Sequence, residues 1–200
     1  MAFKFAVLIL AAGASTRMKR PKQLLPIGNT TLLGNAISSA QKITPDRVIC
    51  VLGANSEEIK ASVNFTGVEI VENPDWERGM GSSIAAGIQR IMTERFDLLL
   101  ITLCDQPLLG DQHLRKLLSQ CPENSKAIVA TDYGGTAGVP ALFPTSTFQL
   151  LKTLKGDKGA KLILNDPSQM VERVVAEQQT MDVDTELAYK EVLSEWTKLR

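Results

Sequence analysis

The chain has few of the residues that build disulfide frameworks, metal knuckles or histidine-based catalysis. Its 200 residues include three cysteines and a single histidine, His113. Three scattered cysteines are too few for a disulfide framework and lack the spacing of a metal knuckle, so we expect a reducing, cytoplasmic environment. We expect His113 to lie on the protein surface, because no cysteine or candidate nucleophile stands near it in the sequence. The chemistry of the chain should therefore need no histidine base.

Net charge and long apolar runs are also missing. The 22 basic and 22 acidic residues cancel, so nothing in the overall charge attracts the chain to nucleic acid or to a membrane surface. No segment approaches the length of a membrane span. Lys4 and the short apolar run that follows it resemble a signal peptide only weakly, and we expect none. We therefore expect no nucleic-acid or membrane partner, and we expect any anion site to be a local cluster of cations.

What remains is the composition of a soluble globular domain, with 44% hydrophobic and 22% charged residues. No repeat or linker divides the chain, so we expect one domain over residues 1–200. Strand-like apolar runs alternate with helical patterns, which predicts a Rossmann-like three-layer α/β sandwich with a mostly parallel sheet. The glycine-rich segment from Tyr133 to Gly138, between two strand-like pieces, is predicted to be a loop near a site. The predicted strands cover residues 5–10, 47–52, 68–71, 98–103, 127–130 and 171–176, and the predicted helices cover 31–41, 56–63, 82–94, 110–119, 146–154, 159–164 and 185–199.

The loop after the first strand is the strongest candidate site, because ligands of such sheets bind outside the carboxyl ends of the strands. Ala11, Ala12 and Gly13 have little or no side chain, so backbone N–H groups in this loop can approach an anion. Arg17 adds a guanidinium fork and Lys22 an ammonium group. The spacing is neither that of a dinucleotide fingerprint nor that of a P-loop. We predict a polyphosphate site; the alternative is an exposed basic loop with no ligand.

Two further loops carry candidate metal ligands. Asp105 follows the strand predicted over residues 98–103, where a carboxylate can hold Mg²⁺ against a triphosphate, although it also suits a turn or a helix cap. Asp182 and Asp184 are two residues apart, so their side chains project to one side of an extended segment. We predict Asp182 as a second metal ligand. For Asp184 a ligand and the N-cap of the following helix both stay open.

A third loop leads into the helix predicted from Ser82. Gly81, Ser82 and their neighbours combine small residues with hydroxyls at a helix N-terminus, which can receive a base, a ribose or a phosphate. The alternative for Ser82 is a plain N-cap. Asn73, a little earlier, is either a polar reader of a base or a turn former. Residues 156–161 also contain glycines and lysines, but they follow a helical pattern, so we predict a turn between two helices.

Together these residues resemble a known family. Gly13, Arg17 and Lys22 match the Gly-x-x-x-Arg and Pro-Lys signature of nucleotidyltransferases with a glycosyltransferase-A-type, Rossmann-like fold. Further segments extend the likeness over nearly the whole chain. They are similar to the MobA-like branch and, within it, to the molybdenum cofactor cytidylyltransferases; the segments are residues 10–13, 79–87, 104–107, 138–143, 156–160 and 182–185.

The resemblance implies an activity and a role for each motif. The activity is Mg²⁺-dependent transfer of CMP from CTP to the phosphate of molybdopterin cofactor, with release of pyrophosphate and in support of molybdoenzyme maturation. A target molybdoenzyme is a further candidate partner. Arg17 would grip the departing phosphates, Lys22 would stabilise charge at the α-phosphate, and Asp105 with Asp182 would hold Mg²⁺. The nucleotide would contact Leu10, Ala11, Ala12, Gly13, Lys22, Asn73, Gly81 and Ser82.

Two positions bear on the substrates. Guanylyltransferase relatives tend to have Gly-Gly where this chain has Ala12 and Gly13, which favours CTP over GTP. Relatives often have a histidine at the position of Val139, so this chain lacks a hydrogen-bond donor there and the acceptor stays open. A sugar phosphate or a polyol phosphate is the alternative acceptor. A non-catalytic carrier of molybdenum cofactor is the alternative function, although Lys22 and Asp105 argue against it, because binding alone needs neither a metal carboxylate nor a charge at the reacting phosphate.

Overall fold

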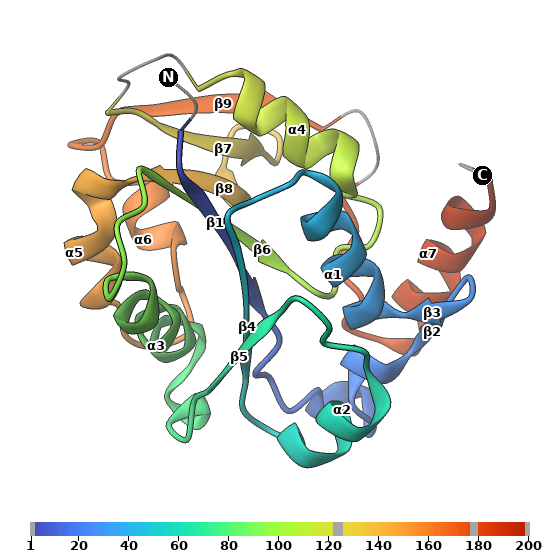
Figure 1. Ribbon diagram of the computed structural model, residues 1–200. Coiled ribbons are helices and arrows are strands. Elements are labelled where there is room, and N and C mark those ends of the chain that lie inside the picture. Colours follow the sequence, from blue (N-terminus) through green and yellow to red (C-terminus); the bar gives the residue numbers. More distant parts are fainter. Residues whose placement is uncertain (1–2, 122–125, 177–179, 199–200) are drawn as a thin grey trace.

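The computed structural model describes residues 3–121, 126–176 and 180–198. A seven-stranded sheet with the order β5-β4-β1-β6-β8-β7-β9 forms its centre (Figure 1). Strand β8 runs antiparallel to both of its neighbours, and the other pairings are parallel. The strands are β1 (Phe5–Leu10), β4 (Arg47–Leu52), β5 (Glu69–Glu72), β6 (Leu98–Leu103), β7 (Ile128–Asp132), β8 (Ala137–Pro144) and β9 (Val171–Val175), and a separate small hairpin pairs β2 (Pro26–Ile27) with β3 (Thr30–Thr31).

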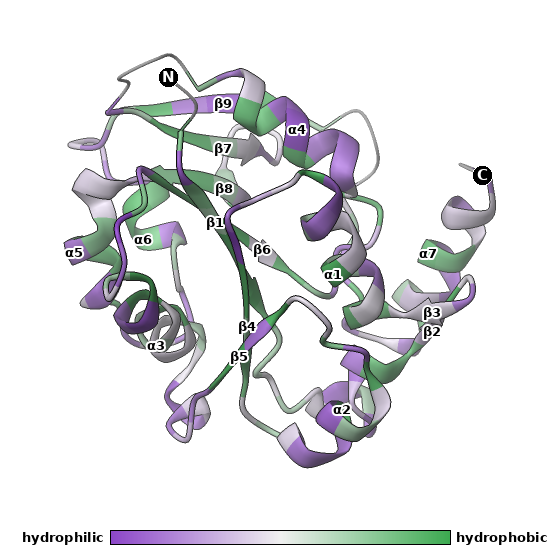
Figure 2. Cartoon of the chain, viewed as in Figure 1, coloured by the Kyte–Doolittle hydropathy of each residue, from purple (hydrophilic) through white to green (hydrophobic). Residues whose placement is uncertain are grey.

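Helices cover both faces of the sheet, because successive side chains of a buried strand point to opposite sides. In β1, Leu8 belongs to one buried cluster, whereas Val7 and Ile9 belong to another. The Leu8 side is covered by α3 (Met80–Ile91), α5 (Phe148–Lys152) and α6 (Lys161–Leu164). The opposite side is covered by α1 (Leu32–Lys42), α2 (Ser56–Ser62) and α4 (Asp111–Ser119). The central strands carry the most hydrophobic residues (Figure 2), and the three-layer arrangement agrees with the predicted fold class.

The C-terminal helix α7 (Glu186–Lys198) lies beside the β2–β3 hairpin (Figure 1). Its Tyr189 and Val192 are buried against Ile27 and Leu32, in a third apolar cluster that also contains Val183. The Tyr189 hydroxyl donates to the carbonyl of Pro26. This packing anchors the segment that contains Asp182 and Asp184 beside the loop that follows β1. None of the helices in the described part of the chain is long and apolar enough to cross a membrane.

Strand β8 is missing from the predicted set. It contains Gly138 and Pro140, and a proline cannot donate a hydrogen bond to a strand ladder, so its sequence argues against a central strand. The structure accommodates this with a register shift in the β7–β8 pairing at Ala130 and Thr131. Strands β1, β4 and β6 have the predicted bounds, and the loop predicted from Tyr133 is the turn between β7 and β8.

The prediction for His113 was wrong. Its side chain is buried, with 3% exposed, beside Leu114 and Leu117 on the inner face of α4. Its Nε2 atom lies 2.8 Å from the Thr131 hydroxyl on β7. A polar partner from another element makes this burial tolerable, and a single sequence position does not reveal such a partner.

Candidate functional site

A cavity of about 600 Å³ lies at the carboxyl ends of β1 and β6. Three segments supply most of its walls: the loop after β1, the start of α3 and the end of β6. This is the edge of the sheet at which the sequence predicts a ligand site. The lining residues are Leu10, Ala11, Ala12, Gly13, Ala14, Ser15, Thr16, Arg17, Lys22, Gln23, Trp76, Glu77, Gly79, Met80, Ser83, Leu103, Cys104, Asp105 and Asp157.

The loop after β1 is held in place by Gln23. This glutamine is buried, with 1% exposed. Its Nε2 atom donates to the carbonyls of Ala11 at 2.8 Å and Gly13 at 2.9 Å. A Cβ added at Gly13 would have no atom within 4 Å outside the neighbouring residues, so this position opens onto free space. The loop therefore combines a fixed backbone with room for a ligand, and sequence reasoning missed Gln23 because a lone glutamine carries no motif.

The predicted cations meet the predicted carboxylates at the mouth of this loop. The Lys22 Nζ atom lies 2.5 Å from Asp105 Oδ2 and 2.8 Å from Asp184 Oδ1. Arg17 Nη2 lies 2.9 Å from Asp184 Oδ2. The Lys22 and Asp105 side chains are 16% and 14% exposed, whereas Arg17 is 69% exposed. Lys22 is therefore a fixed interior charge, and Arg17 is free to turn toward a ligand.

Asp105 and Asp184 determine the ionisation of Lys22. Burial alone would lower the pKa of this lysine, but the charge and hydrogen bond of Asp105 and the hydrogen bond of Asp184 outweigh burial and raise it. For Asp184, burial alone would raise the pKa of the carboxyl group, but the hydrogen bonds and charges of Lys22 and Arg17 outweigh burial and lower this pKa. Lys22 and Asp184 are therefore both charged near neutral pH.

The carboxylates fit a divalent cation that also binds a ligand. Asp105 Oδ1 is buried with no hydrogen-bond partner, and Val183 N donates to the Asp105 carbonyl at 2.9 Å, which places the residues around Val183 beside Asp105. Burial raises the pKa of Asp182, and the nearby charges of Asp105 and Asp184 add to this. Within the described ranges, no group of three or more His, Cys, Asp or Glu side chains is arranged to hold a metal ion. Mg²⁺ usually takes one or two carboxylates plus phosphate oxygens and water, which this donor set can provide.

The structure argues against the capping role of Asp184, and its role as a metal ligand stays a prediction. Helix α7 begins at Glu186, and Thr185 Oγ1 accepts a hydrogen bond from Ala188 N at 3.2 Å. Thr185 therefore makes the capping contact. Asp184 instead faces the two cations of the first loop.

Three predicted nucleotide contacts lie behind the cavity wall. Asn73 is buried, and its Nδ2 atom donates to the hydroxyls of Ser82 at 2.9 Å and Ser83 at 3.0 Å. The Ser82 hydroxyl donates to the carbonyl of Gly79, inside the first turn of α3, so Ser82 is not the N-cap. Gly81 N donates to the Gly156 carbonyl at 2.8 Å. Their neighbour Ser83 is a lining residue of the cavity, whereas these three are not. A direct contact of Asn73, Gly81 or Ser82 with a nucleotide stays a prediction.

The turn predicted at residues 156–161 joins α5 to α6 and packs on the start of α3. A Cβ at Gly81 would stand 2.6 Å from Lys155 N, and one at Gly79, whose φ is +91°, would stand 2.4 Å from Asp157 Oδ1. Both glycines are therefore needed for this close contact. The contact also brings Asp157 into the cavity wall, which Trp76 and Met80 line as well. Met80 and Asp157 belong to the segments 79–87 and 156–160 that carry the family resemblance, but none of the three was predicted as a site residue.

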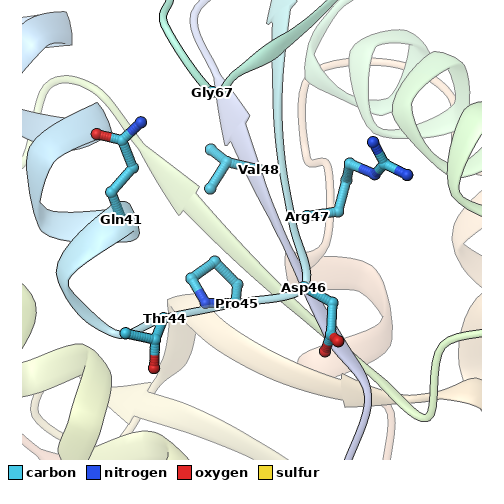
Figure 3. A pocket seen from close by; sticks show the side chains of 7 residues that line it. All are labelled: Gln41, Thr44, Pro45, Asp46, Arg47, Val48 and Gly67. Atoms are coloured by element: carbon cyan, nitrogen blue, oxygen red, sulfur yellow. The ribbon is translucent and has the colours of Figure 1, made fainter.

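A second, smaller cavity of about 190 Å³ lies at the opposite edge of the sheet (Figure 3). Two of its polar side chains form hydrogen bonds with the backbone: Asp46 Oδ2 accepts from Phe5 N at 2.9 Å, and Gln41 Nε2 donates to the Thr66 carbonyl at 2.8 Å. The guanidinium of Arg47 extends away from Gln41 in Figure 3. Of its two charged lining residues, Asp46 accepts from the backbone and Arg47 pairs with Glu94 at 3.0 Å.

Comparisons with known proteins agree with the fold and identify the family. The family model described as a MobA-like NTP transferase domain matches residues 7–174. Nicotine blue oxidoreductase of Paenarthrobacter nicotinovorans is 33% identical, covering 89% of this chain and 91% of that protein. Purine catabolism protein PucB of Bacillus subtilis is 29% identical, covering 78% of each. The crystal structure of Rv0371C from Mycobacterium tuberculosis in complex with manganese is 28% identical, with a TM-score of 0.80 over 96% of this chain and 98% of that one.

Proposed function

Since the chain belongs to the family with the MobA-like NTP transferase domain, we propose that it transfers CMP from CTP to the phosphate of molybdopterin cofactor and releases pyrophosphate. The product would then serve the maturation of a molybdoenzyme. The observation that carries the proposal is Lys22, fixed between Asp105 and Asp184 at the edge of the large cavity, with Arg17 beside it. This places cations and carboxylates together where a triphosphate would enter.

The reaction suits a site without a histidine base. A phosphate oxygen of the acceptor attacks the α-phosphorus of CTP, and the bond from that phosphorus to the β-phosphate oxygen breaks. A phosphate monoester has a second pKa near 6, so at pH 7 it is already largely ionised and no proton has to be removed. Such a transfer depends on positioning and charge stabilisation. In the proposal, Lys22 stabilises the α-phosphate and the exposed Arg17 leaves Asp184 to bind the departing phosphates.

Asp105 and Asp182 are the proposed ligands of Mg²⁺. When bound, such an ion would neutralise charge on the triphosphate oxygens. The unpartnered Asp105 Oδ1 atom and the excess of carboxylates support this role. The manganese in the Rv0371C complex supports a divalent cation as well. The ion pairs of Lys22 with Asp105 and Asp184, and of Arg17 with Asp184, would partly neutralise this group of carboxylates until the nucleotide and metal arrive.

The choice of CTP and of the acceptor rests on fewer observations. Ala12 lines the cavity and, through the resemblance of the first loop, favours CTP. Val139 is half-buried in β8 and offers no side-chain donor to an acceptor. A sugar phosphate or a polyol phosphate is therefore the acceptor to compare with molybdopterin cofactor.

Pyrophosphate release tests the proposal directly. The purified chain is incubated with Mg²⁺, each of the four nucleoside triphosphates, and molybdopterin cofactor or a panel of sugar and polyol phosphates. We expect release with CTP and molybdopterin cofactor, and its loss in Asp105→Ala. Asp166→Ala, at an exposed turn position, is the matched control and should behave like the wild type. Release with sugar phosphates alone would replace the proposed acceptor, and cofactor delivery to a target enzyme without pyrophosphate release would indicate a carrier.

The relative named an oxidoreductase motivates one further arm of the same experiment. Oxidation of a reduced nicotinamide cofactor is followed by its absorbance in the same reactions. The proposal predicts no change in this absorbance. Nicotinamide oxidation without pyrophosphate release would favour a redox reaction over nucleotide transfer.

A further inference from the structure

Gln106 occupies a buried position between the proposed metal ligands and the β7–β8 hairpin. Its side chain follows Asp105 directly and is 6% exposed. The Nε2 atom donates to Asp182 Oδ1 at 2.8 Å and to the Tyr133 hydroxyl at 2.9 Å. The Oε1 atom is buried with no hydrogen-bond partner among the described residues. A buried amide oxygen without a hydrogen-bond partner costs folding free energy. The side chain is nevertheless held in this orientation by its two donated hydrogen bonds.

The partners of the amide determine its orientation. An ionised carboxylate only accepts hydrogen bonds, so the nitrogen of Gln106 must face Asp182. The Tyr133 hydroxyl donates its own hydrogen to the Val139 carbonyl at 2.5 Å, so its oxygen accepts from Gln106. The hydrogen bonds therefore run in one direction from Gln106 to Asp182 and, through Tyr133, to β8.

A glycine allows the tyrosine to reach this position. A Cβ at Gly138 would stand 2.8 Å from the Tyr133 ring, so the ring lies against the backbone of β8. Gly138 and Val139 belong to the segment that resembles the acceptor side of the family. Gln106 thus connects that segment to Asp182.

Asp182 needs such a contact because its surroundings are negative. Asp184 is two residues away, with its N–H donating to the Asp182 carbonyl at 3.0 Å, and the hydrogen bond from Val183 N to the Asp105 carbonyl holds Asp105 beside the same segment. Two like charges nearby push a carboxylate away from the position that a shared cation requires. A fixed donor on one oxygen holds the side chain in place and leaves the other oxygen for a metal.

We propose that Gln106 is a positioning residue that holds Asp182 for binding of the divalent cation and links this position to the β7–β8 hairpin. The inference rests on the proposed function for the identity of the metal ligands. Hydrogen-bond partners that orient metal ligands typically change metal affinity by about 10-fold to 100-fold when they are removed. The alternative is that Gln106 only fills space in the core.

A Mn²⁺ titration distinguishes a positioning role of Gln106 from a role in core packing alone. Free Mn²⁺ is measured by electron paramagnetic resonance with the full chain, without nucleotide, for the wild type, Gln106→Met, Asp182→Asn and Tyr133→Phe. Gln106→Met keeps the length of the side chain and removes both donors. The matched control is Gln149→Met, at an exposed position on α5. Circular dichroism melting curves establish that each variant is folded.

We expect the Mn²⁺ dissociation constant to rise about tenfold or more in Gln106→Met and in Asp182→Asn, less in Tyr133→Phe, and not at all in the control. At saturating Mn²⁺ the turnover number of Gln106→Met should recover, so that the defect lies in the metal concentration needed for half-maximal rate. Unchanged Mn²⁺ affinity in Gln106→Met or in Asp182→Asn, or no Mn²⁺ binding by the wild type, would overturn the inference. If Gln106→Met does not fold, Tyr133→Phe decides, with weaker binding in support and wild-type binding against.

The same titration tests the role of Gln106 independently of the proposed function. Wild-type chain that binds Mn²⁺ but releases no pyrophosphate from any nucleoside triphosphate would contradict the proposed function. The affinity ratio between Gln106→Met and the wild type would still support or overturn the role of Gln106.

Discussion

Two ion-pair networks lie at opposite ends of the strands of the central sheet. At the amino end of the strands, Arg47 and Arg90 bind Glu94, and Arg90 also binds Glu69. This network joins β4, β5 and α3 with two cations and two carboxylates. At the carboxyl end, Arg17 and Lys22 face three carboxylates at positions 105, 182 and 184.

The difference between the networks lies in charge balance. The amino-end network is neutral, and the pKa of Glu94 is lowered by its hydrogen bonds to Arg90 and Arg47. The carboxyl-end network has one excess negative charge. Each network contains one buried atom without a hydrogen-bond partner among the described residues, Arg47 Nε at the amino end and Asp105 Oδ1 at the carboxyl end, and each borders a cavity, so the charge balance is the difference between them. A balanced network of half-buried pairs is expected to add a modest amount of stability. The unbalanced network, whose Lys22–Asp105 pair is mostly buried, would gain from a further cation, which supports the proposal that it is the functional region.

Removal of the metal should have the largest effect. Excess EDTA is expected to abolish pyrophosphate release, because Asp105 and Asp182 would then face the triphosphate without a neutralising ion. Mg²⁺ or Mn²⁺ added back should restore the rate. Release that persists in EDTA would remove the main difference between the two networks.

Exchange of one cation in each network gives the next largest effect. Lys22→Met should lower kcat by about 10²-fold to 10³-fold, the loss typical of removing one preorganised charge stabiliser. Arg47→Met, the matched change at the amino end, should leave kcat unchanged and lower the melting temperature slightly. Steady-state kinetics and thermal melting measure both. Similar losses of kcat in the two variants would contradict the functional distinction.

Asp184→Asn should have a smaller effect on activity. Asp184 binds both Lys22 and Arg17, so the substitution weakens their alignment but leaves Lys22 paired with Asp105. We expect a reduction in kcat/KM of about tenfold, similar to the loss of one charged hydrogen bond. Thr185→Ala serves as control, because it affects the capping contact of α7 and should change stability alone. An unchanged kcat/KM in Asp184→Asn would limit the functional network to Lys22 and Asp105.

Asp182→Asn should have the smallest effect of these changes, a small increase in melting temperature. The direction of this change tests whether ionised Asp182 destabilises the fold. The pKa of Asp182 is above that of an unfolded chain, so ionisation of this group reduces stability as the pH rises past its unfolded pKa. Without metal at pH 7, the asparagine variant should therefore melt at a slightly higher temperature than the wild type. At a pH below the unfolded pKa the difference should vanish. A lower melting temperature at pH 7 would show that ionised Asp182 stabilises the fold.

The sequence predicted most of the sheet and the cluster of charged residues. Strand β1 and the loop after it follow from an apolar run and small residues, and parallel strands bring Lys22, Asp105 and the segment of Asp182 to one edge. Gln23 and Gln106 were beyond this reasoning, because their roles depend on contacts with residues 10 to 76 positions away. The amino-end network was also unpredicted, since Arg47 and Glu94 are 47 positions apart.

Nucleotide transfer at the carboxyl-end network can be followed directly. The most direct measurement uses CTP labelled at the α-phosphate, with Mg²⁺ and molybdopterin cofactor, and follows the label by chromatography in the wild type and in Asp105→Asn. We expect label on the cofactor and an equal amount of pyrophosphate with the wild type, and neither with the variant. Cofactor that stays unlabelled with the wild type, or equal labelling by Asp105→Asn, would contradict it.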